Sequence, residues 1–218
     1  MKERPILFSG HMVRALLDGS KTQTRRVVKL PHNNPLGQWE PTTIGGENGG
    51  RTAAGEALPL QGGIWHTRTG DSLMCPHGQP GDRLWVRETH LNWWKRDEAN
   101  PDVARVFSHV AAYAADGYEL ELGEKWIPSI HMLRAASRIT LDVTGVRVER
   151  LQDICEADAI AEGIAKTAAG FWSTYGRSGV DGTYSPVSSY HCLWDSINGA
   201  DSWDANPWVW VVEFKRAT

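Results

Sequence analysis

The 218-residue sequence predicts an α+β fold in which strands dominate and the helices are short. Apolar residues recur at helical spacing only over brief segments, the first of which is residues 12–17. Apolar and polar residues alternate over residues 137–148, which is typical of a long strand or a hairpin. The hydrophobic fraction of 41% is compatible with a substantial buried core.

The first helix is expected to end at Gly19, because glycine readily adopts the left-handed conformation that closes a helix. A polar segment then leads into a strand that begins near residues 26–28. This turn brings an amine, a hydroxyl and a guanidinium into one small volume, so Lys21 and Thr24 are expected to meet. The alternative is a purely structural turn, since basic residues offset the negative end of a helix and threonine is common in turns.

Two segments are expected to be insertions. Residues 31–80 contain many glycines and prolines and show little periodicity. Within them, residues 63–67 predict a short strand and residues 45–55 predict a mobile loop. The second insertion covers about residues 95–126.

The C-terminal part continues with regular elements. Residues 153–164 read as a short acidic helix that Gly163 ends, and residues 208–214 form an apolar strand. Trp208 and Trp210 alternate on that strand, which places most tryptophans in the core. Exposed rings that could stack on bases are expected in less regular stretches, at Trp93, Trp94 and Trp172.

The composition limits the classes of protein to which the chain can belong. No segment approaches the roughly 20 apolar residues that span a bilayer, and the N-terminus has no apolar signal core, so a cytoplasmic protein without a membrane partner is expected. The three cysteines fit reduced thiols better than a disulfide framework. The pair Cys75 and His77 has no second close pair to complete a tetrahedral site, so no metal and no cofactor are expected.

Charge argues against tight binding of a nucleic-acid duplex. The net charge is −3, whereas proteins that depend on phosphate contacts usually carry a basic excess. Basic residues nevertheless gather around the polar turn, at Arg14, Lys21, Arg25, Arg26 and Lys29. A small anionic or polar ligand fits this local cluster better than a duplex does.

The polar turn carries a family resemblance. The residues Gly19, Lys21, Thr24 and Arg26 match in order and spacing the G-x-K-x-x-T-x-R signature of the ASCH domain, a family similar to the PUA RNA-binding fold. Residues 80–88 resemble the second-strand region of that family, and residues 208–214 resemble its closing strand. The layout of the chain resembles the long ASCH proteins of bacterial prophages.

The resemblance implies a PUA-like mixed β-barrel with short flanking helices and two loop insertions. It implies a single domain over residues 1–218, with insertions at about 31–80 and 95–126. Short members of the family that hydrolyse N4-acetylcytidine lack both insertions.

The resemblance also implies an activity. In the short hydrolases, a glutamate acts with the motif lysine and threonine, and this role maps onto Glu162, with Glu156 as a weaker candidate. Thr24 would attack the acyl carbon, Lys21 would take its proton, and Glu162 would hold the lysine or protonate the departing amine. The alternative is that both glutamates simply face solvent.

Four further residues are candidates for substrate binding. Arg25 and Arg26 would contact a polar ligand and lower the pKa of the lysine, and Phe8 would present its ring beside the motif. Glu88 would accept a hydrogen bond from the exocyclic amine of a cytosine-like base, or would form an ion pair with Arg26 or Arg87.

The sequence thus predicts an amidohydrolase of N4-acylated cytosine nucleosides whose partner is a modified nucleoside or nucleobase. The alternative is an RNA-binding or RNA-cleaving PUA-like module without amidase activity, for which single-stranded RNA is the partner. A third class is a phage accessory protein that binds another protein.

Overall fold

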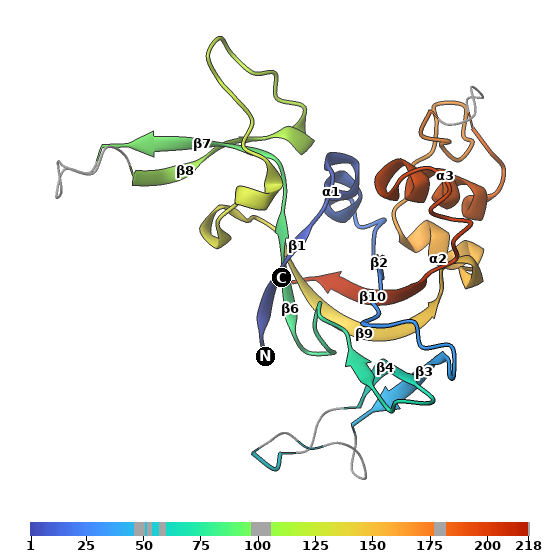
Figure 1. The fold of residues 1–218 in the computed structure, drawn as a ribbon. Coiled ribbons are helices and arrows are strands. Elements are labelled where there is room, and N and C mark those ends of the chain that lie inside the picture. The colour runs from blue at the N-terminus through green and yellow to red at the C-terminus, as the bar shows by residue number, and fades with distance from the viewer. Residues whose placement is uncertain (46–50, 52–53, 57–59, 97–105, 177–181, 218) are drawn as a thin grey trace.

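The computed structural model describes residues 1–45, 51, 54–56, 60–96, 106–176 and 182–217 (Figure 1). Its centre is a mixed five-stranded sheet in the order β1-β6-β9-β10-β2. β1 pairs with β6 in parallel, and the other neighbours are antiparallel. The strands are β1 (Glu3–Leu7), β2 (Gln23–Val27), β6 (Arg83–Arg87), β9 (Thr140–Arg150) and β10 (Trp208–Arg216). The α+β prediction is confirmed.

β1 and β2 are the two edges of this sheet, and within the described ranges no ladder of backbone hydrogen bonds joins them. The strand pairings of the described residues therefore do not close the sheet into the predicted barrel. One side chain links the two edges, because Nη2 of Arg26 donates to the carbonyl of Leu7 at 2.6 Å.

The long antiparallel strand pair β9–β10 forms the centre of the core. Every position from Trp208 to Arg216 pairs with β9, with an irregularity between Glu213 and Phe214. The strand expected over residues 137–148 is confirmed as one continuous strand rather than a hairpin. Val209, Val211 and Trp210 are buried, as apolar side chains on both faces of a covered strand must be.

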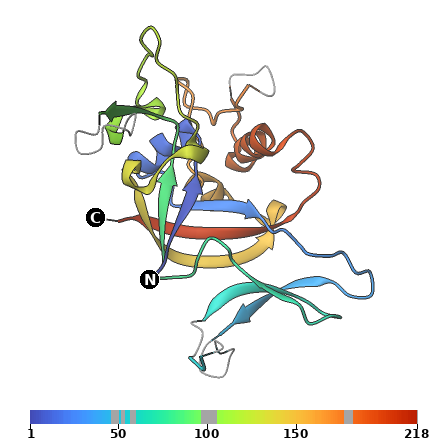
Figure 2. The same ribbon diagram turned by 60° about the vertical axis from the view of Figure 1, so that its left-hand side comes forward.

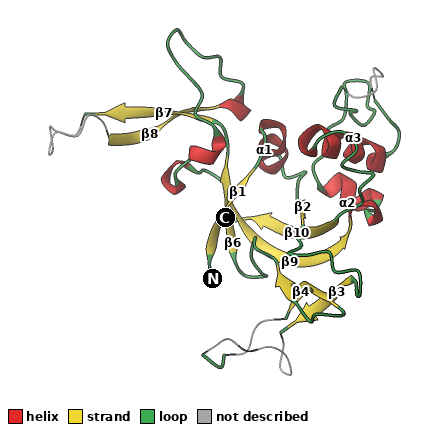
Figure 3. Ribbon diagram, in the orientation of Figure 1, coloured by secondary structure: helices red, strands yellow, loops and turns green. Residues whose placement is uncertain are grey.

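Three helices cover one side of the sheet (Figures 1 and 3): α1 (Gly10–Leu17), α2 (Glu156–Ala161) and α3 (Pro186–Asn198). Gly19 follows α1 with φ of +83°, as expected. The helix expected over residues 153–164 is the shorter α2 preceded by a 3-10 turn. α3 was not predicted, although Ser185 caps its N-terminus and Pro186 is its first residue. The 3-10 turns are η1 (Ala114–Asp116), η2 (Ser129–His131), η3 (Arg134–Ala136) and η4 (Leu151–Asp153).

The first expected insertion folds into a sheet of its own. β3 (Trp39–Ile44), β4 (Gln61–His66) and β5 (Ser72–Met74) are antiparallel, and β4 contacts β9 on the side opposite the helices (Figure 2). β4 confirms the strand expected over residues 63–67. The loop expected over residues 45–55 falls mostly on residues 46–50 and 52–53, which lie outside the described part.

A hairpin whose first strand precedes the second expected insertion and whose second strand lies within it projects away from the rest of the structure (Figure 1). β7 (His90–Lys95) pairs with β8 (Val106–Tyr113). Trp93 is 59% exposed and Trp94 is 43% exposed, in agreement with the expectation of exposed rings there, whereas Trp172 is half-buried.

No helix in the described ranges is long and apolar enough to cross a membrane.

Trp210→Ala should destabilise the protein by about 3–5 kcal/mol, because it removes a large ring from a packed interior. Trp93→Ala is the matched control on an exposed strand, and it should change the free energy of unfolding by less than about 0.5 kcal/mol. Urea denaturation monitored by circular dichroism measures both. Equal losses for the two variants would show that the β10 face is not the core.

Candidate functional site

The polar turn after α1 packs against the C-terminal end of α2. The backbone of Lys21 donates to the carbonyl of Ala15 at 2.9 Å, and the backbone of Thr22 donates to the carbonyl of Ala161 at 2.8 Å. Lys21 and Glu162 form an isolated antiparallel bridge. Two segments 141 positions apart in the chain are thereby held in contact.

The Lys21 ammonium is enclosed by Glu162. Its Nζ donates to the backbone carbonyl of Glu162 at 2.8 Å and to Oε2 of the same residue at 2.9 Å. Lys21 is 2% exposed and Glu162 is 1% exposed. The lysine therefore has two oxygen acceptors from one residue and almost no contact with solvent.

Gly163 makes this approach possible. It has φ of +77°, which L side chains rarely adopt, and it ends α2 beside Lys21. A Cβ atom added here would lie 2.7 Å from the Cβ of Lys21 and 2.8 Å from the Cβ of Ala15. The helix end can contact the lysine only without a side chain at this position.

Arg25 fixes the other oxygen of the same carboxylate. Its Nη1 lies 3.1 Å from Oε1 of Glu162, and its Nη2 lies 2.5 Å from Glu149 and 2.8 Å from Asp158. Both oxygens of Glu162 are thus engaged, one by each cation, and the carboxylate cannot rotate without losing a charge-assisted hydrogen bond.

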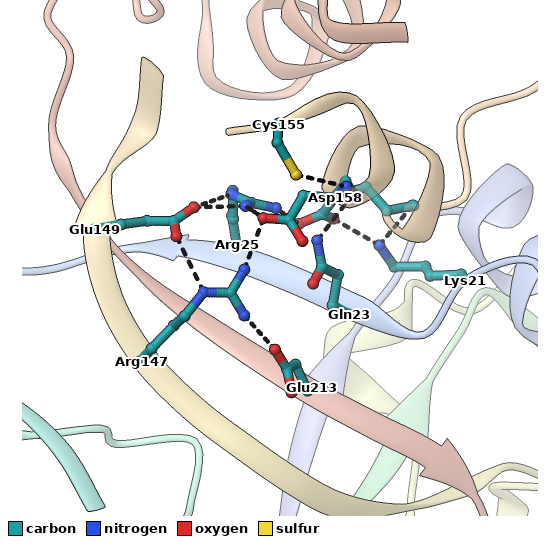
Figure 4. Close-up of polar contacts among 9 residues, drawn as sticks. Lys21, Gln23, Arg25, Arg147, Glu149, Cys155, Asp158 and Glu213 are labelled. Carbon is teal, nitrogen blue, oxygen red and sulfur yellow. Dashed lines mark hydrogen bonds and ion pairs between the residues drawn. The ribbon is translucent and has the colours of Figure 1, made fainter. Parts of the chain in front are cut away.

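A second arginine extends the cluster toward the surface (Figure 4). Arg147 contacts Glu149 at 3.1 Å and Asp158 at 2.7 Å, and it also pairs with Glu213. Arg147 and Glu149 lie two residues apart on β9, so both side chains point to the same face. Charged residues at every second position of a strand are the sequence signal by which this cluster could have been predicted.

Burial and neighbouring charges change the pKa of the Lys21 amine. Desolvation lowers the pKa of Lys21, Glu162 opposes this effect, and the positive charges of Arg26 and Arg25 lower the pKa further, so that the net direction is downward. For Arg25, burial also lowers the pKa, but Glu162 and Glu149 outweigh it and the net direction is upward. The two neighbouring cations therefore respond oppositely: Arg25 stays charged and Lys21 releases its proton more easily.

Thr24 is the second residue of β2, is 1% exposed, and pairs with Val212 of β10. It borders a cavity of about 50 Å³ together with Glu162 and Tyr190. Apolar side chains complete the wall, namely Met12, Leu193, Trp194 and Ile197. Burial raises the pKa of Tyr190, so its hydroxyl stays protonated and can donate. Tyr190, on the unpredicted α3, is a site residue that sequence reasoning missed.

Phe8 and Arg26 form the adjoining wall. The ring of Phe8 is buried, and its centroid lies 5.5 Å from Nζ of Lys21 and 5.3 Å from the guanidinium of Arg26. The ring thus contacts the two cations of the motif. Arg26 is half-buried, and desolvation lowers its pKa.

Glu88 belongs to a different cluster. Its two oxygens accept from Arg138 at 2.9 and 3.0 Å, and Arg138 also contacts Asp116 and lies 3.8 Å from the ring centroid of Tyr113. The ion-pair alternative is therefore confirmed, but the partner predicted for it was wrong. Glu156 is exposed, as the solvent alternative for that residue expected.

The structure brings Lys21, Glu162, Arg25, Arg26 and Phe8 into one set of contacts, and Thr24 borders the same cavity as Glu162. Among the described residues, no hydrogen bond joins Thr24 to Lys21, so the expected meeting of these two side chains is not seen as a contact. Asp158 and Glu149, which hold Arg25, were also missed in the sequence. Among the described residues, no group of three or more His, Cys, Asp or Glu side chains is arranged to hold a metal ion.

In comparisons with family models, curated proteins and solved structures, none matches the chain. The chemistry of the site therefore follows from its own contacts, burial and charges.

Gly163→Ala should destabilise the protein more than Gly19→Ala, by at least about 1 kcal/mol, because only at position 163 does the new methyl group overlap a neighbour. Both glycines have positive φ, so the backbone cost of about 1–2 kcal/mol is common to the two variants. Thermal and urea unfolding measure the difference. Equal losses would mean that Lys21 can move aside freely.

The acid stability of the protein should depend on Asp158. Burial by itself raises the pKa of Asp158, but Arg147 and Arg25 outweigh it and hold the pKa below its ordinary value of 3.8. A lowered pKa in the folded state means that this contribution to stability is present at neutral pH and is lost as the pH falls below 3.8 toward the lowered value.

Asp158→Asn should therefore reduce the free energy of unfolding at pH 7. It should also narrow the gap between the free energies of unfolding at pH 7 and pH 3. Asp153→Asn, at an exposed carboxylate, is the control and should keep the wild-type gap. An unchanged gap in Asp158→Asn would contradict the coupling of Asp158 to the two arginines.

Proposed function

We propose that the protein hydrolyses the acyl amide of N4-acylated cytosine nucleosides such as N4-acetylcytidine. Thr24 is the nucleophile, Lys21 is the base and Glu162 holds the lysine. The proposal includes a PUA-like barrel as the scaffold, with the contact from Arg26 to Leu7 bridging its open edge.

The observation that carries the proposal is the buried contact between Lys21 and Glu162, together with a buried Thr24 that borders the same cavity as Glu162. A threonine hydroxyl is a weak nucleophile at neutral pH unless a base accepts its proton. Lysine serves as such a base when burial and neighbouring cations lower its pKa, and both causes act on Lys21. A structural role needs neither of them.

The reaction balances with these groups. Oγ of Thr24 bonds to the acyl carbon while its proton passes to the Lys21 amine. The bond from the acyl carbon to the N4 nitrogen then breaks, and the proton held by Lys21 goes to the departing amine. Water adds to the acyl-threonine ester, the ester bond breaks, and a carboxylic acid and the free hydroxyl are released.

The cavity beside Thr24 favours a small acyl group. A volume of about 50 Å³ exceeds the roughly 30 Å³ that one liquid water occupies, so it suits a group of only about two or three heavy atoms. The lining of the cavity combines apolar side chains, such as Leu193 and Trp194, which suit a methyl group, with polar ones, such as Glu162 and Tyr190. An acetyl group has this size and likewise combines an apolar methyl group with a polar carbonyl.

A second candidate function is supported by the projecting hairpin. Trp93 and Trp94 are exposed next to Lys95 and Arg96, which combines flat rings with positive charge. Such a combination stacks on the bases of single-stranded RNA and contacts its phosphates. RNA binding without amide hydrolysis is therefore the alternative.

Incubation of the purified protein with N4-acetylcytidine should release cytidine and acetate. Thr24→Ala and Lys21→Met should each lower kcat at least about 100-fold, because each removes a group that acts in the bond-forming step. Thr22→Ala is the matched control on the exposed neighbouring threonine and should keep wild-type turnover. Chromatography of the products gives all four rates.

Turnover that survives both Thr24→Ala and Lys21→Met would overturn the assignment. If the wild type releases no cytidine and a fluorescent RNA oligonucleotide binds with a dependence on Trp93 and Trp94, the RNA-binding alternative stands in its place.

A further inference from the structure

The wall of the cavity that Thr24 borders includes a hydrogen-bond donor without an acceptor. The Nε1–H group of Trp194 is buried and has no hydrogen-bond partner within the described part of the chain. Trp194 is 4% exposed and borders the cavity of about 50 Å³ together with Thr24 and Glu162. Burying a donor without an acceptor is unfavourable, so a ligand oxygen at this position would be stabilised.

Trp194 stands apart from the other buried polar atoms that lack a partner. Six more such atoms are found in the described part, and they belong to His11, Arg87, His90, Asn92, Thr167 and His191. Among the described residues that border the cavity, none of these six is present. Within this set, the unpaired donor coincides with the proposed acyl site only at Trp194.

Tyr190 provides a second donor from the same helix. It is buried, borders the same cavity and precedes Trp194 by four residues on α3, so the two rings leave the same face of the helix. Their centroids are 6.2 Å apart. Burial raises the pKa of Tyr190, so its hydroxyl keeps its proton at neutral pH. α3 thus contributes two donors to the wall of one small cavity.

The charges around the cavity favour an oxygen that becomes negative. Arg25 and Arg26 both border it. The carboxylate of Glu162 also borders it, but its two oxygens are already engaged by Lys21 and Arg25. Arg26 donates to a backbone carbonyl rather than to a carboxylate, so its positive charge can act on a bound group.

The cavity has both buried and exposed walls. Trp194 and Tyr190 are buried, whereas Ile197 is 47% exposed and Asn198 is also exposed. An acyl group can therefore lie against the buried donors while the rest of a substrate extends past the exposed residues. This division is required, because the cavity holds only a few heavy atoms.

We propose that Trp194 and Tyr190 donate hydrogen bonds to the acyl oxygen of the substrate and stabilise the negative charge that develops on it. The inference rests on the proposed function, to which it adds the oxyanion donors.

The two donors act without losing their protons. When Oγ of Thr24 bonds to the acyl carbon, the π electron pair of the carbonyl group moves to its oxygen. The Nε1–H of Trp194 and the hydroxyl of Tyr190 donate to that oxygen while it is negative. The electron pair returns to re-form the carbonyl double bond as the bond to N4 breaks. Donors placed in advance need no reorganisation during this step.

Steady-state hydrolysis of N4-acetylcytidine tests the role of the donors. Trp194→Phe and Tyr190→Phe each keep an aromatic ring and remove one donor. Each should lower kcat about 100-fold and leave KM nearly unchanged, because an oxyanion donor acts mainly in the transition state. Trp203→Phe is the matched control, since Trp203 is buried beside Tyr190 but does not border the cavity. It should keep the wild-type kcat.

A second measurement needs neither turnover nor a variant. Acetamide carries the acetyl group and the amide nitrogen of the substrate, and its carbonyl oxygen can accept from Trp194. In proton–nitrogen correlation spectra of the wild type, acetamide should shift the assigned indole cross-peak of Trp194 downfield, because a new hydrogen bond deshields the proton. The cross-peak of the exposed Trp93, on the projecting hairpin, should stay in place.

The two measurements separate this inference from the proposed function. Wild-type kcat in either Trp194→Phe or Tyr190→Phe, with turnover that still depends on Thr24, overturns the donors and keeps the hydrolase. A Trp194 cross-peak that does not shift at the highest soluble concentration of acetamide also overturns the inference. A wild type that shows this shift but releases no cytidine removes the hydrolase and leaves the two donors as a site for a small amide.

Discussion

The buried contact between Lys21 and Glu162 is the constraint on which the arrangement of the site depends. Enclosing two opposite charges removes their hydration, and an apolar pair of similar size is often at least as stabilising. Here the desolvation is offset by further partners, because Arg25 holds the free oxygen of the carboxylate and a backbone carbonyl accepts from the amine. A costly ionic pair that is fully hydrogen-bonded fits the chemical role that we propose for Lys21.

The same contact determines how three parts of the chain meet. The end of α1, the start of β2 and the end of α2 converge on it, and the arginine cluster connects it to β9. Removal of the Glu162 carboxylate would leave the buried Lys21 ammonium without its counter-charge, which costs more than the pair contributes. The network of Glu149, Asp158 and Arg147 thus keeps charges balanced from the interior to the surface.

Local patterns in the sequence predicted much of this arrangement. The end of α1 at Gly19 and the long strand β9 follow from helical and alternating spacing, which depend on neighbouring residues only. The sheet of the first insertion was missed because its glycines and prolines mask the alternation, and α3 was missed because serines and a histidine interrupt its apolar stripe. The partner predicted for Glu88 was wrong because no local pattern relates Glu88 to Arg138, and the pairing of β6 with β9 brings these two segments together.

The two acceptors on Lys21 have a directional consequence. A neutral amine has two hydrogens and one lone pair, and both hydrogens already have partners in the carbonyl and Oε2 of Glu162. Loss of the third proton therefore breaks neither contact, and the lone pair points along the one remaining tetrahedral direction. Glu162 thereby orients the orbital of the amine as well as its charge, so the lysine needs no reorganisation between its acidic and basic forms.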